Sequence, residues 1–461
     1  MASHFANAIP TRLSMWQRVR EYAVPPSMIE TATARRATGD WAGACAAARV
    51  DVDLDLRAVR QRHGTELVTL LRADLRRLAP DLLRWHMPRI APDGWLRPGL
   101  TLSLARYPGR LHLVVRTPPA WADAGQRMSL ALWEESGSGA VPGHPHPHPD
   151  RRFRLDLHRH LWDAGRSGEL TRRCAAITAS DSSWDESSWA EASWAGEAEL
   201  LLRAEGRARG AFTVRLGARS RAVLELVAPD DSHVPTLRSP RRPLPPQEVA
   251  ALPVLPEAAA RVLPDLELLR AGLVTVDRLH PLVAAALRAY GPASAPRPVP
   301  EPADPHRVEC RGEVHRIALR DGVLTAVDHQ PAELRREELL VALGGPALPC
   351  LRAIDSVHRS PQALPAVRER LGHGDVTGAL AVIEGLLGPG AMLRDGPLRE
   401  ELESAAARRV EHGLFRAGLV AEHPAAGGGA EVRRGRLDRR TPLPWRRKRG
   451  SRTRPRTGLP L

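Results

Sequence analysis

The strongest chemical signal in the sequence is an alternation of acidic and imidazole side chains in RLDLHRHLWD, residues 154–163. In a β-strand, residues two positions apart point to the same face, so Asp156, His158 and His160 would lie together. Carboxylates and imidazoles bind divalent metals, and Asp163 would add a second carboxylate. No motif requires a cofactor, and a divalent metal at these four residues is the one cofactor that the sequence suggests.

The D-x-H-x-H pattern is similar to the first-strand motif of the amidohydrolase and PHP-type metal hydrolases. The resemblance implies a metal-dependent hydrolase centred on Asp156, His158 and His160. Those families place the motif in an eight-fold or seven-fold βα barrel and take further ligands from later strands. The surrounding sequence has the pattern of β-hairpins and no βα alternation. A metal-dependent hydrolase is therefore the alternative function and not the leading one.

Two further clusters could bind a metal but have simpler explanations. The histidines of GHPHPHPD (143–150) alternate with prolines, which predicts a low-complexity linker that binds zinc or nickel adventitiously. The aspartates of VDVDLDLR (50–57) also alternate, but this segment lacks the glycine and glutamate of an EF-hand loop. Asp55 is instead predicted to cap the helix that follows it.

The lysine and cysteine content excludes several enzyme classes. Lys448 is the only lysine among 67 basic residues, so the chain lacks the lysine of a P-loop, a protein kinase or a pyridoxal-phosphate enzyme. Cys45, Cys174, Cys310 and Cys350 form no CxxC pair and no Cys/His zinc spacing, so we expect reduced, mostly buried thiols. Because no apolar signal segment or long uncharged apolar run occurs, we expect a cytoplasmic protein that does not enter a membrane.

The net charge of +14 is concentrated at the C-terminus. Residues 431–461 hold twelve basic and two acidic residues, a net charge of +10, which leaves +4 for the first 430 residues. The high arginine content also indicates codon usage of a high-GC bacterium. We predict a disordered basic tail at 424–461. Nucleic acid is a candidate partner for its basic side chains, namely Arg446, Arg447, Lys448, Arg449, Arg452, Arg454 and Arg456.

Segments rich in proline, glycine or serine divide the chain. The alternating prolines of 291–306 predict an extended linker between an α+β domain at 28–290 and a small α+β module at 307–423. Residues 1–27 are predicted to be a disordered N-terminal extension. Low-complexity inserts within the first domain are predicted at 135–150, 178–198 and 229–249.

The hydrophobic periodicity predicts an α+β fold, with N-terminal helices, a central antiparallel β-sheet or small sandwich, and then a smaller α+β module with a helical end. Leucines at helical spacing after Thr65 predict a helix that ends before Pro80. Alternation around Pro108-Gly109 predicts a hairpin. Further strands are expected at 128–133, 198–205, 211–217 and 221–228.

After these strands the pattern returns to helix over 256–290. A helix–turn–helix there would resemble a DNA reader, but Pro281 would lie inside its second helix, which favours ordinary helix packing. In the module, Asp321-Gly322 predicts a second hairpin. Helices are expected after it near 331–343, 361–371, 375–387 and 397–417.

Two distant segments share Gly-Asp-x-x-Gly-Ala after an arginine, namely ARRATGDWAGACAAA (34–48) and RERLGHGDVTGALAV (368–382). The pattern is similar to the helix–turn–helix of a tetratricopeptide-type repeat, which implies a protein-binding surface. No array with a 34-residue period is present, so a tight αα-hairpin in each segment is the alternative. Trp184, Trp189 and Trp194 recur every five residues, which either presents aromatic side chains to a partner or reflects expansion of a short repeat.

No phosphate-binding loop, nucleophile elbow or cysteine nucleophile can be recognised. The leading hypothesis is therefore a non-catalytic binding or scaffold protein that contacts an unidentified protein partner. The alternatives are the metal-dependent hydrolase and a nucleic-acid-associated protein that acts through the tail. The hydrolase requires further Asp, Glu or His side chains within ligand distance of His158 and His160, which a structure can test.

Overall fold

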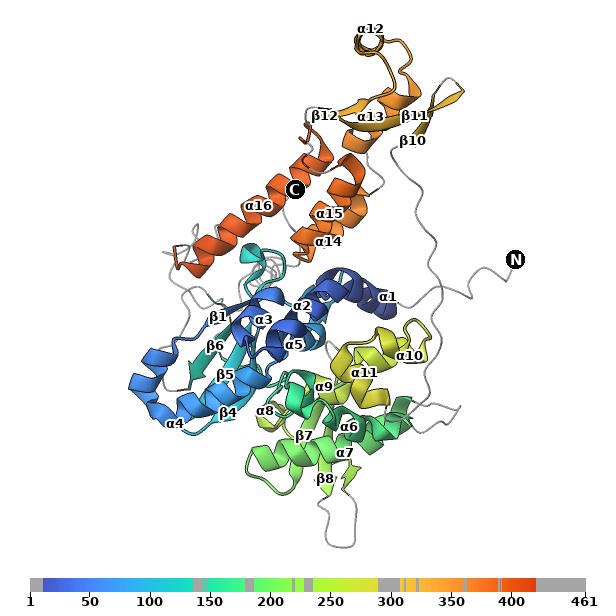
Figure 1. Ribbon diagram of the computed structural model, residues 1–461. Coiled ribbons are helices and arrows are strands. Elements are labelled where there is room, and N and C mark those ends of the chain that lie inside the picture. Colours follow the sequence, from blue (N-terminus) through green and yellow to red (C-terminus); the bar gives the residue numbers. More distant parts are fainter. Residues whose placement is uncertain are drawn as a thin grey trace, which may run out of the picture.

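The protein is described from a computed structural model, drawn as a ribbon in Figure 1. The structure describes residues 11–135, 144, 146, 148–178, 186–217, 220–227, 235–288, 307–310, 312–320, 323–359, 363–388, 390 and 392–419. These residues form helices and four small sheets, which confirms the predicted α+β class.

A four-stranded sheet lies at the centre of the N-terminal body, which we define as residues 11–288. Its strands are β1 (Val50–Asp53), β4 (Thr101–Tyr107), β5 (Leu111–Arg116) and β6 (Met128–Glu134), in the order β1-β6-β5-β4. β4 and β5 pair antiparallel around the predicted turn, where Gly109 has a φ of +80°. β1 adds to the antiparallel strands as an edge strand parallel to β6, a pairing that the sequence did not predict.

The helix α4 (Leu56–Arg77) confirms the predicted N-terminal helix. Asp55 caps it as expected, because its side chain accepts hydrogen bonds from the backbone N–H groups of Arg57 and Ala58. The helix therefore begins earlier than Thr65, and it bends at Gly64, which has a φ of +88°. Beyond the bend, its buried face packs in the main hydrophobic core through Leu67, Leu71 and Leu75.

The strand predicted at 198–205 is wrong, because those residues lie at the end of α7 (Glu186–Ala204). Ala198, Leu201 and Leu202 follow helical spacing and are buried together in a separate small core. Phe212 packs there from the second sheet, which is antiparallel and contains β7 (Gly210–Arg215), β8 (Arg221–Val227) and β9 (Thr236–Arg238).

The other elements of the body are short. Pro281 is the first residue of α11, so it starts that helix and does not interrupt it. The remaining helices and strands are α1 (Thr11–Arg18), α2 (Pro26–Ala37), α3 (Trp41–Ala47), α5 (Pro80–His86), β2 (Arg89–Ile90), β3 (Trp95–Leu96), α6 (Glu169–Thr178), α8 (Pro246–Ala251), α9 (Glu257–Ala260), α10 (Pro264–Arg270) and α11 (Pro281–Arg288).

We call residues 307–419 the C-terminal module. It opens with the sheet β10 (Arg307–Cys310), β11 (Glu313–Arg320) and β12 (Val323–Ala326), whose β11–β12 pairing confirms the predicted hairpin. The predicted helices are α12 (Pro331–Ala342), α14 (Leu364–Gly372), α15 (Val376–Leu387) and α16 (Pro397–Arg416). One helix that was not predicted, α13 (Pro349–Arg359), completes the module and its own hydrophobic core.

The two Gly-Asp-x-x-Gly segments form the same αα-hairpin. Asp40 caps α3 by accepting from the N–H of Gly43, and Asp375 caps α15 by accepting from Gly378. The cap explains the second glycine, since a Cβ on Gly43 would lie 2.1 Å from the Asp40 carboxylate, and the distance at Gly378 is the same. The preceding glycine has a positive φ in both turns, as an αL residue after a helix requires.

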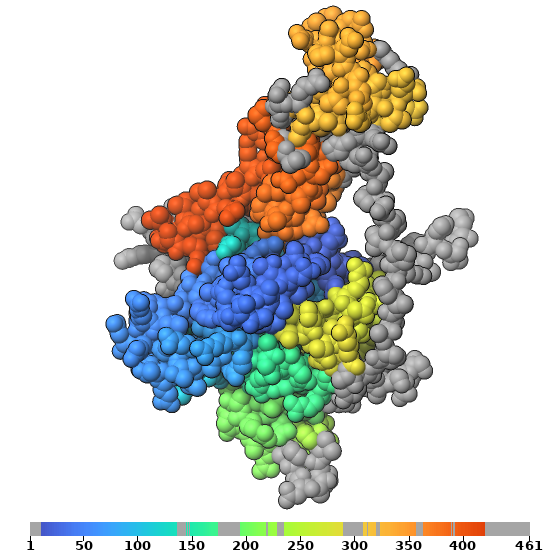
Figure 2. All heavy atoms as spheres, in the orientation of Figure 1, coloured from blue at the N-terminus to red at the C-terminus, as the bar shows by residue number. Residues whose placement is uncertain are grey.

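The module contacts the body through its last three helices, and its sheet, α12 and α13 lie farther away (Figures 1 and 2). Arg49 donates a hydrogen bond of 2.5 Å to the carbonyl oxygen of His373. Phe415 packs edge-on against Trp121, with ring centroids 5.4 Å apart. Two of the alternating aspartates also lie here: Asp51 accepts from Arg127 and lies 3.4 Å from His412 Nε2, and Asp53 binds Arg416. Strand β1 therefore binds α16 through the side chains of Asp51 and Asp53.

Candidate metal centre

Three metal-ligating side chains meet in the C-terminal module, one from each of three chain segments. Cys310 is the last residue of β10, His329 lies between β12 and α12, and Cys350 is in the first turn of α13. One donor atom from each residue lies within 4.8 Å of the other two, and all three residues are buried. Within the described parts of the chain, this is the one group of three or more His, Cys, Asp or Glu residues with that proximity.

Local structure explains how the three segments come together. β10 and β11 pair up to Cys310 and Glu313, so the strand ends in a tight turn that contains Gly312 with a φ of +85°. The N–H of His329 donates to the carbonyl oxygen of Ala326, which turns the chain at the end of β12. Cys350 follows Pro349, the first residue of α13, where the helix dipole favours a thiolate.

A carboxylate orients the histidine of this group. Nδ1 of His329 lies 3.5 Å from Oε2 of Glu333, one helical turn further on. Nδ1 therefore carries the proton, as assigned from this contact, and the lone pair lies on Nε2. Nε2 is buried and has no hydrogen-bond partner within the described structure. A carboxylate behind the ring and a free nitrogen in front of it is the usual arrangement of a metal-ligating histidine.

A second histidine, His315, stacks on one face of the His329 ring. The His315 and His329 rings are stacked, with centroids 4.3 Å apart and planes inclined by 9°. The stack fixes the plane of the His329 ring, and Glu333 fixes its rotation within that plane. Both neighbours therefore restrict the orientation of the His329 ring beside the two cysteines.

The donor set determines which metal would fit. Two thiolates and an imidazole are soft or borderline donors, which select Zn²⁺ over Mg²⁺ or Ca²⁺. Burial and the neighbouring Cys310 thiol raise the pKa of Cys350 to about 12, so the metal-free Cys350 holds its proton and metal binding would release it. Cys45, Cys310 and Cys350 are free buried thiols, as expected. The spacing of Cys310 and Cys350 in the sequence matches no zinc motif, and the fold brings them together with His329.

The sequence suggested four metal ligands, Asp156, His158, His160 and Asp163. They do not lie on a strand, as had been expected. Residues 154–163 form turns and a short 3₁₀ helix (Arg159–Leu161) and not a strand. The side chains of Asp156 and Asp163 are both held by arginines. Asp156 pairs with Arg154 at 2.9 Å, and Asp163 pairs with Arg159 at 3.1 Å.

His158 and His160 are buried with ring centroids 5.9 Å apart. His158 Nδ1 lies 3.0 Å from the carbonyl oxygen of Arg154, and its Nε2 lies 3.1 Å from Oε2 of Glu197. Burial and the nearby His158 hold the pKa of His160 well below its usual range. His158 therefore has a carbonyl and a carboxylate beside its two nitrogens, while His160 stays neutral and its Nδ1 is buried with no hydrogen-bond partner in the described structure.

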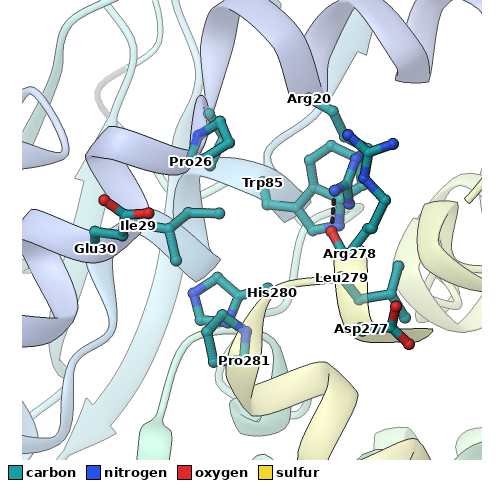
Figure 3. A pocket seen from close by; sticks show the side chains of 11 residues that line it. Arg20, Pro26, Ile29, Glu30, Trp85, Asp277, Arg278, Leu279, His280 and Pro281 are labelled. Atoms are coloured by element: carbon teal, nitrogen blue, oxygen red, sulfur yellow. Dashed lines mark hydrogen bonds between the residues drawn. The ribbon is translucent and has the colours of Figure 1, made fainter. Parts of the chain in front are cut away.

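A pocket of about 330 Å³ lies in the body (Figure 3), with a lining that includes Arg20, Ile29, Glu30, Trp85 and Arg278. His280 also lines it, but both of its ring nitrogens have partners. Nε2 lies 2.8 Å from Oδ2 of the buried Asp81, and Nδ1 accepts from the N–H of Leu282. This imidazole therefore has no nitrogen available to act as a base on a bound molecule.

The remaining candidates lie outside the described residues. These are Trp184 and the side chain of Trp189, and the basic tail residues Arg446, Arg447, Lys448, Arg449, Arg452, Arg454 and Arg456. Trp194 is described and packs against the small core of α7. None of the helices in the described part of the chain has the length and apolar composition needed to cross a bilayer.

Comparison of the chain with protein-family models, with curated proteins and with solved structures finds no match.

Proposed function

We propose that this chain is a non-catalytic binding protein whose C-terminal module is held together by a zinc ion. The observation that carries the proposal is the convergence of Cys310, His329 and Cys350, whose donor atoms lie within 4.8 Å of one another. The three residues come from three segments that are otherwise joined by the pairing of β10 and β12 with β11 and by the small module core. An ion bound to all of them would fix the sheet against α12 and α13.

Burial supports a metal at this position. A buried imidazole nitrogen without a partner costs about 1–3 kcal/mol, and a zinc ion bound to His329 Nε2 would remove this cost. The Glu333 contact further supports it, because such carboxylates recur behind metal-ligating histidines. The geometry therefore favours this site over Asp156, His158, His160 and Asp163, where arginines hold both carboxylates.

The surface of α12 supports a protein as the partner of the module. Three leucines near its C-terminal end are exposed, with 67% of Leu339, 46% of Leu340 and 86% of Leu343 accessible to solvent. Apolar side chains grouped in this way are typical of contact surfaces. Because His329 immediately precedes α12, the zinc ion would set the position of this surface.

Metal analysis of the full chain, purified without a histidine tag, tests the proposal. His144, His146 and His148 should first be replaced by glutamine, because they are a source of adventitious binding. We expect about one zinc per chain, and loss of this zinc in Cys310→Ala and in Cys350→Ala. Cys45→Ala is the matched control, since Cys45 is equally buried but lies in α3 of the body.

A chain without zinc, or with zinc that both module variants retain, would contradict the proposal. Zinc that is lost instead in His158→Ala would favour the hydrolase alternative.

A further inference from the structure

We propose that the zinc ion has three protein ligands only, and that its fourth coordination position takes an exchangeable donor from outside the chain. The donor is water at rest and one small monodentate ligand, such as a soft anion, when present. This inference rests on the proposed zinc site. It predicts that the site binds a ligand in addition to joining three segments of the module.

The nearest further nitrogen ligand cannot complete the site from its position. A metal lies in the plane of an imidazole, along the lone pair of the ligating nitrogen. The His315 and His329 rings are stacked face to face, with planes only 9° apart and centroids 4.3 Å apart. One ion cannot lie in both planes, so His315 supports His329 and does not share its metal.

The neighbouring carboxylates are engaged elsewhere. Glu333 faces Nδ1 of His329, on the side of the ring away from the proposed ion. Asp328 accepts from the backbone N–H of Arg316 at 2.7 Å and from its guanidinium at 3.2 Å. No fourth His, Cys, Asp or Glu of the described chain joins the group of three. Zinc prefers four ligands and the described residues supply three, which supports an external donor for the last position.

Burial and charge define the class of donor. The two cysteines are fully buried, and the side chain of His315 beside His329 is only 14% exposed, so a ligand must be small. Two thiolates already neutralise the charge of Zn²⁺, which weakens its action on water and favours exchange with soft donors. In the exchange, the bound water leaves as the new donor binds, with no change in oxidation state.

Cobalt substitution in the full chain tests this inference, because Co²⁺ takes the same ligands and reports its coordination by visible absorption. The background carries glutamine at 144, 146 and 148. We expect one Co²⁺ per chain with a thiolate charge-transfer band, and a shift of the visible bands when azide is added. His315→Phe keeps the aromatic stack but removes both nitrogens, and we expect it to bind one Co²⁺ with the same response to azide.

The outcomes separate this inference from the proposed function. Visible bands that do not shift when azide is added would contradict the open coordination position. A changed spectrum in His315→Phe would identify His315 as the fourth ligand. Absence of cobalt binding, or binding without a thiolate band, would instead contradict the zinc site itself. We expect the affinity of His315→Phe for Co²⁺ to stay within about 10–100-fold of the parent, the effect typical of a residue that only positions a ligand.

Discussion

Gly125 of the body and Gly374 of the module touch backbone to backbone. A Cβ on Gly374 would lie 2.1 Å from the carbonyl oxygen of Gly125, and one on Gly125 would lie 2.6 Å from Cα of Gly374. Gly374 is also the turn glycine of the α14–α15 hairpin, with a φ of +80°. The contact therefore joins the turn of a hairpin to the surface on which the module rests.

Gly374→Ala should weaken the docking of the module, and Gly39→Ala provides a matched control. Gly39 occupies the equivalent turn with a φ of +78°, but nothing lies within 4 Å of its Cβ position. Both variants place alanine in the left-handed region, at a cost of about 1–2 kcal/mol. Gly374→Ala adds a steric overlap of about 1–3 kcal/mol. Urea unfolding measures both, and equal losses in the two variants would refute the contact.

The two capping aspartates give a second matched pair. Asp40→Ala should cost about 1 kcal/mol, as typical for the loss of a helix cap. Asp375→Ala should cost about 1.5–3 kcal/mol more, because its contact with Arg370 is largely buried, whereas that of Asp40 with Arg35 is exposed, and because Asp375 lies 3.6 Å from Arg49 of the body. A double-mutant cycle with Arg49→Gln measures the part that crosses the interface. A coupling of zero would mean that Arg49 acts through the His373 carbonyl alone.

Glu333→Gln should lower zinc affinity by about 10–100-fold without lowering the stoichiometry at saturation. The amide removes the charge that holds the proton on His329 Nδ1, but it keeps the shape of the side chain. Glu338→Gln on the exposed side of α12 is the control and should bind zinc like the parent. Competition with a chromogenic chelator gives both affinities, and similar values for the two variants would remove Glu333 from the site.

Removal of the metal should affect the module and spare the body. Zinc at about 1,000 times its dissociation constant stabilises the folded state by about 4 kcal/mol, which a chelator would withdraw. We expect faster amide hydrogen exchange in β10, β12 and the start of α13, and unchanged exchange in β4 and β5. Equal acceleration in both regions would indicate general destabilisation by the chelator.

Acid should destabilise the folded protein before its carboxylates titrate. Burial lowers the pKa of His112 to about 4, and burial with Arg89 and Arg84 lowers that of His373 to about 3. In the unfolded chain both titrate near 6.5, so the unfolded state binds protons first as the pH falls. The contribution of these two neutral histidines to the free energy of unfolding is therefore fully present above about pH 6.5, and it is lost as the pH falls toward about 4. Urea midpoints between pH 7.5 and 4.5 measure the decline, and His112→Gln should make it shallower.

Local patterns predicted much of the fold. The Pro108-Gly109 and Asp321-Gly322 hairpins and the Asp55 cap depend on a few adjacent residues, and the corresponding strands and helix are present. The error at 198–205 has a local cause as well. Leu200, Leu201 and Leu202 are consecutive, so the helical spacing of the buried positions was hidden by an apolar run that also fits a strand.

The candidate metal centre could not be predicted from spacing. Forty residues separate Cys310 from Cys350, and His329 lies between them after the hairpin, so no short motif connects the three. The available signal was topological, because β10 and β12 flank β11, and Cys310 ends β10 while His329 follows β12 in the turn before α12. Recognising it needed α13, which was not predicted. Residues 154–163 are the opposite case. Their acidic and imidazole side chains alternate regularly in the sequence, but the segment does not form a strand.

The helix α16 connects the core of the C-terminal module to the surface of the body. Leu398 at its start is buried in the module core, and Phe415 near its end packs on Trp121 of the body. A helix of this length, 20 residues, spans about 30 Å and bends little. Because it is anchored at both ends, a change in its tilt at the body would move the module core. A tilt of about 10° at the body would move the far end, and with it the module core around Leu398, by about 5 Å over that length.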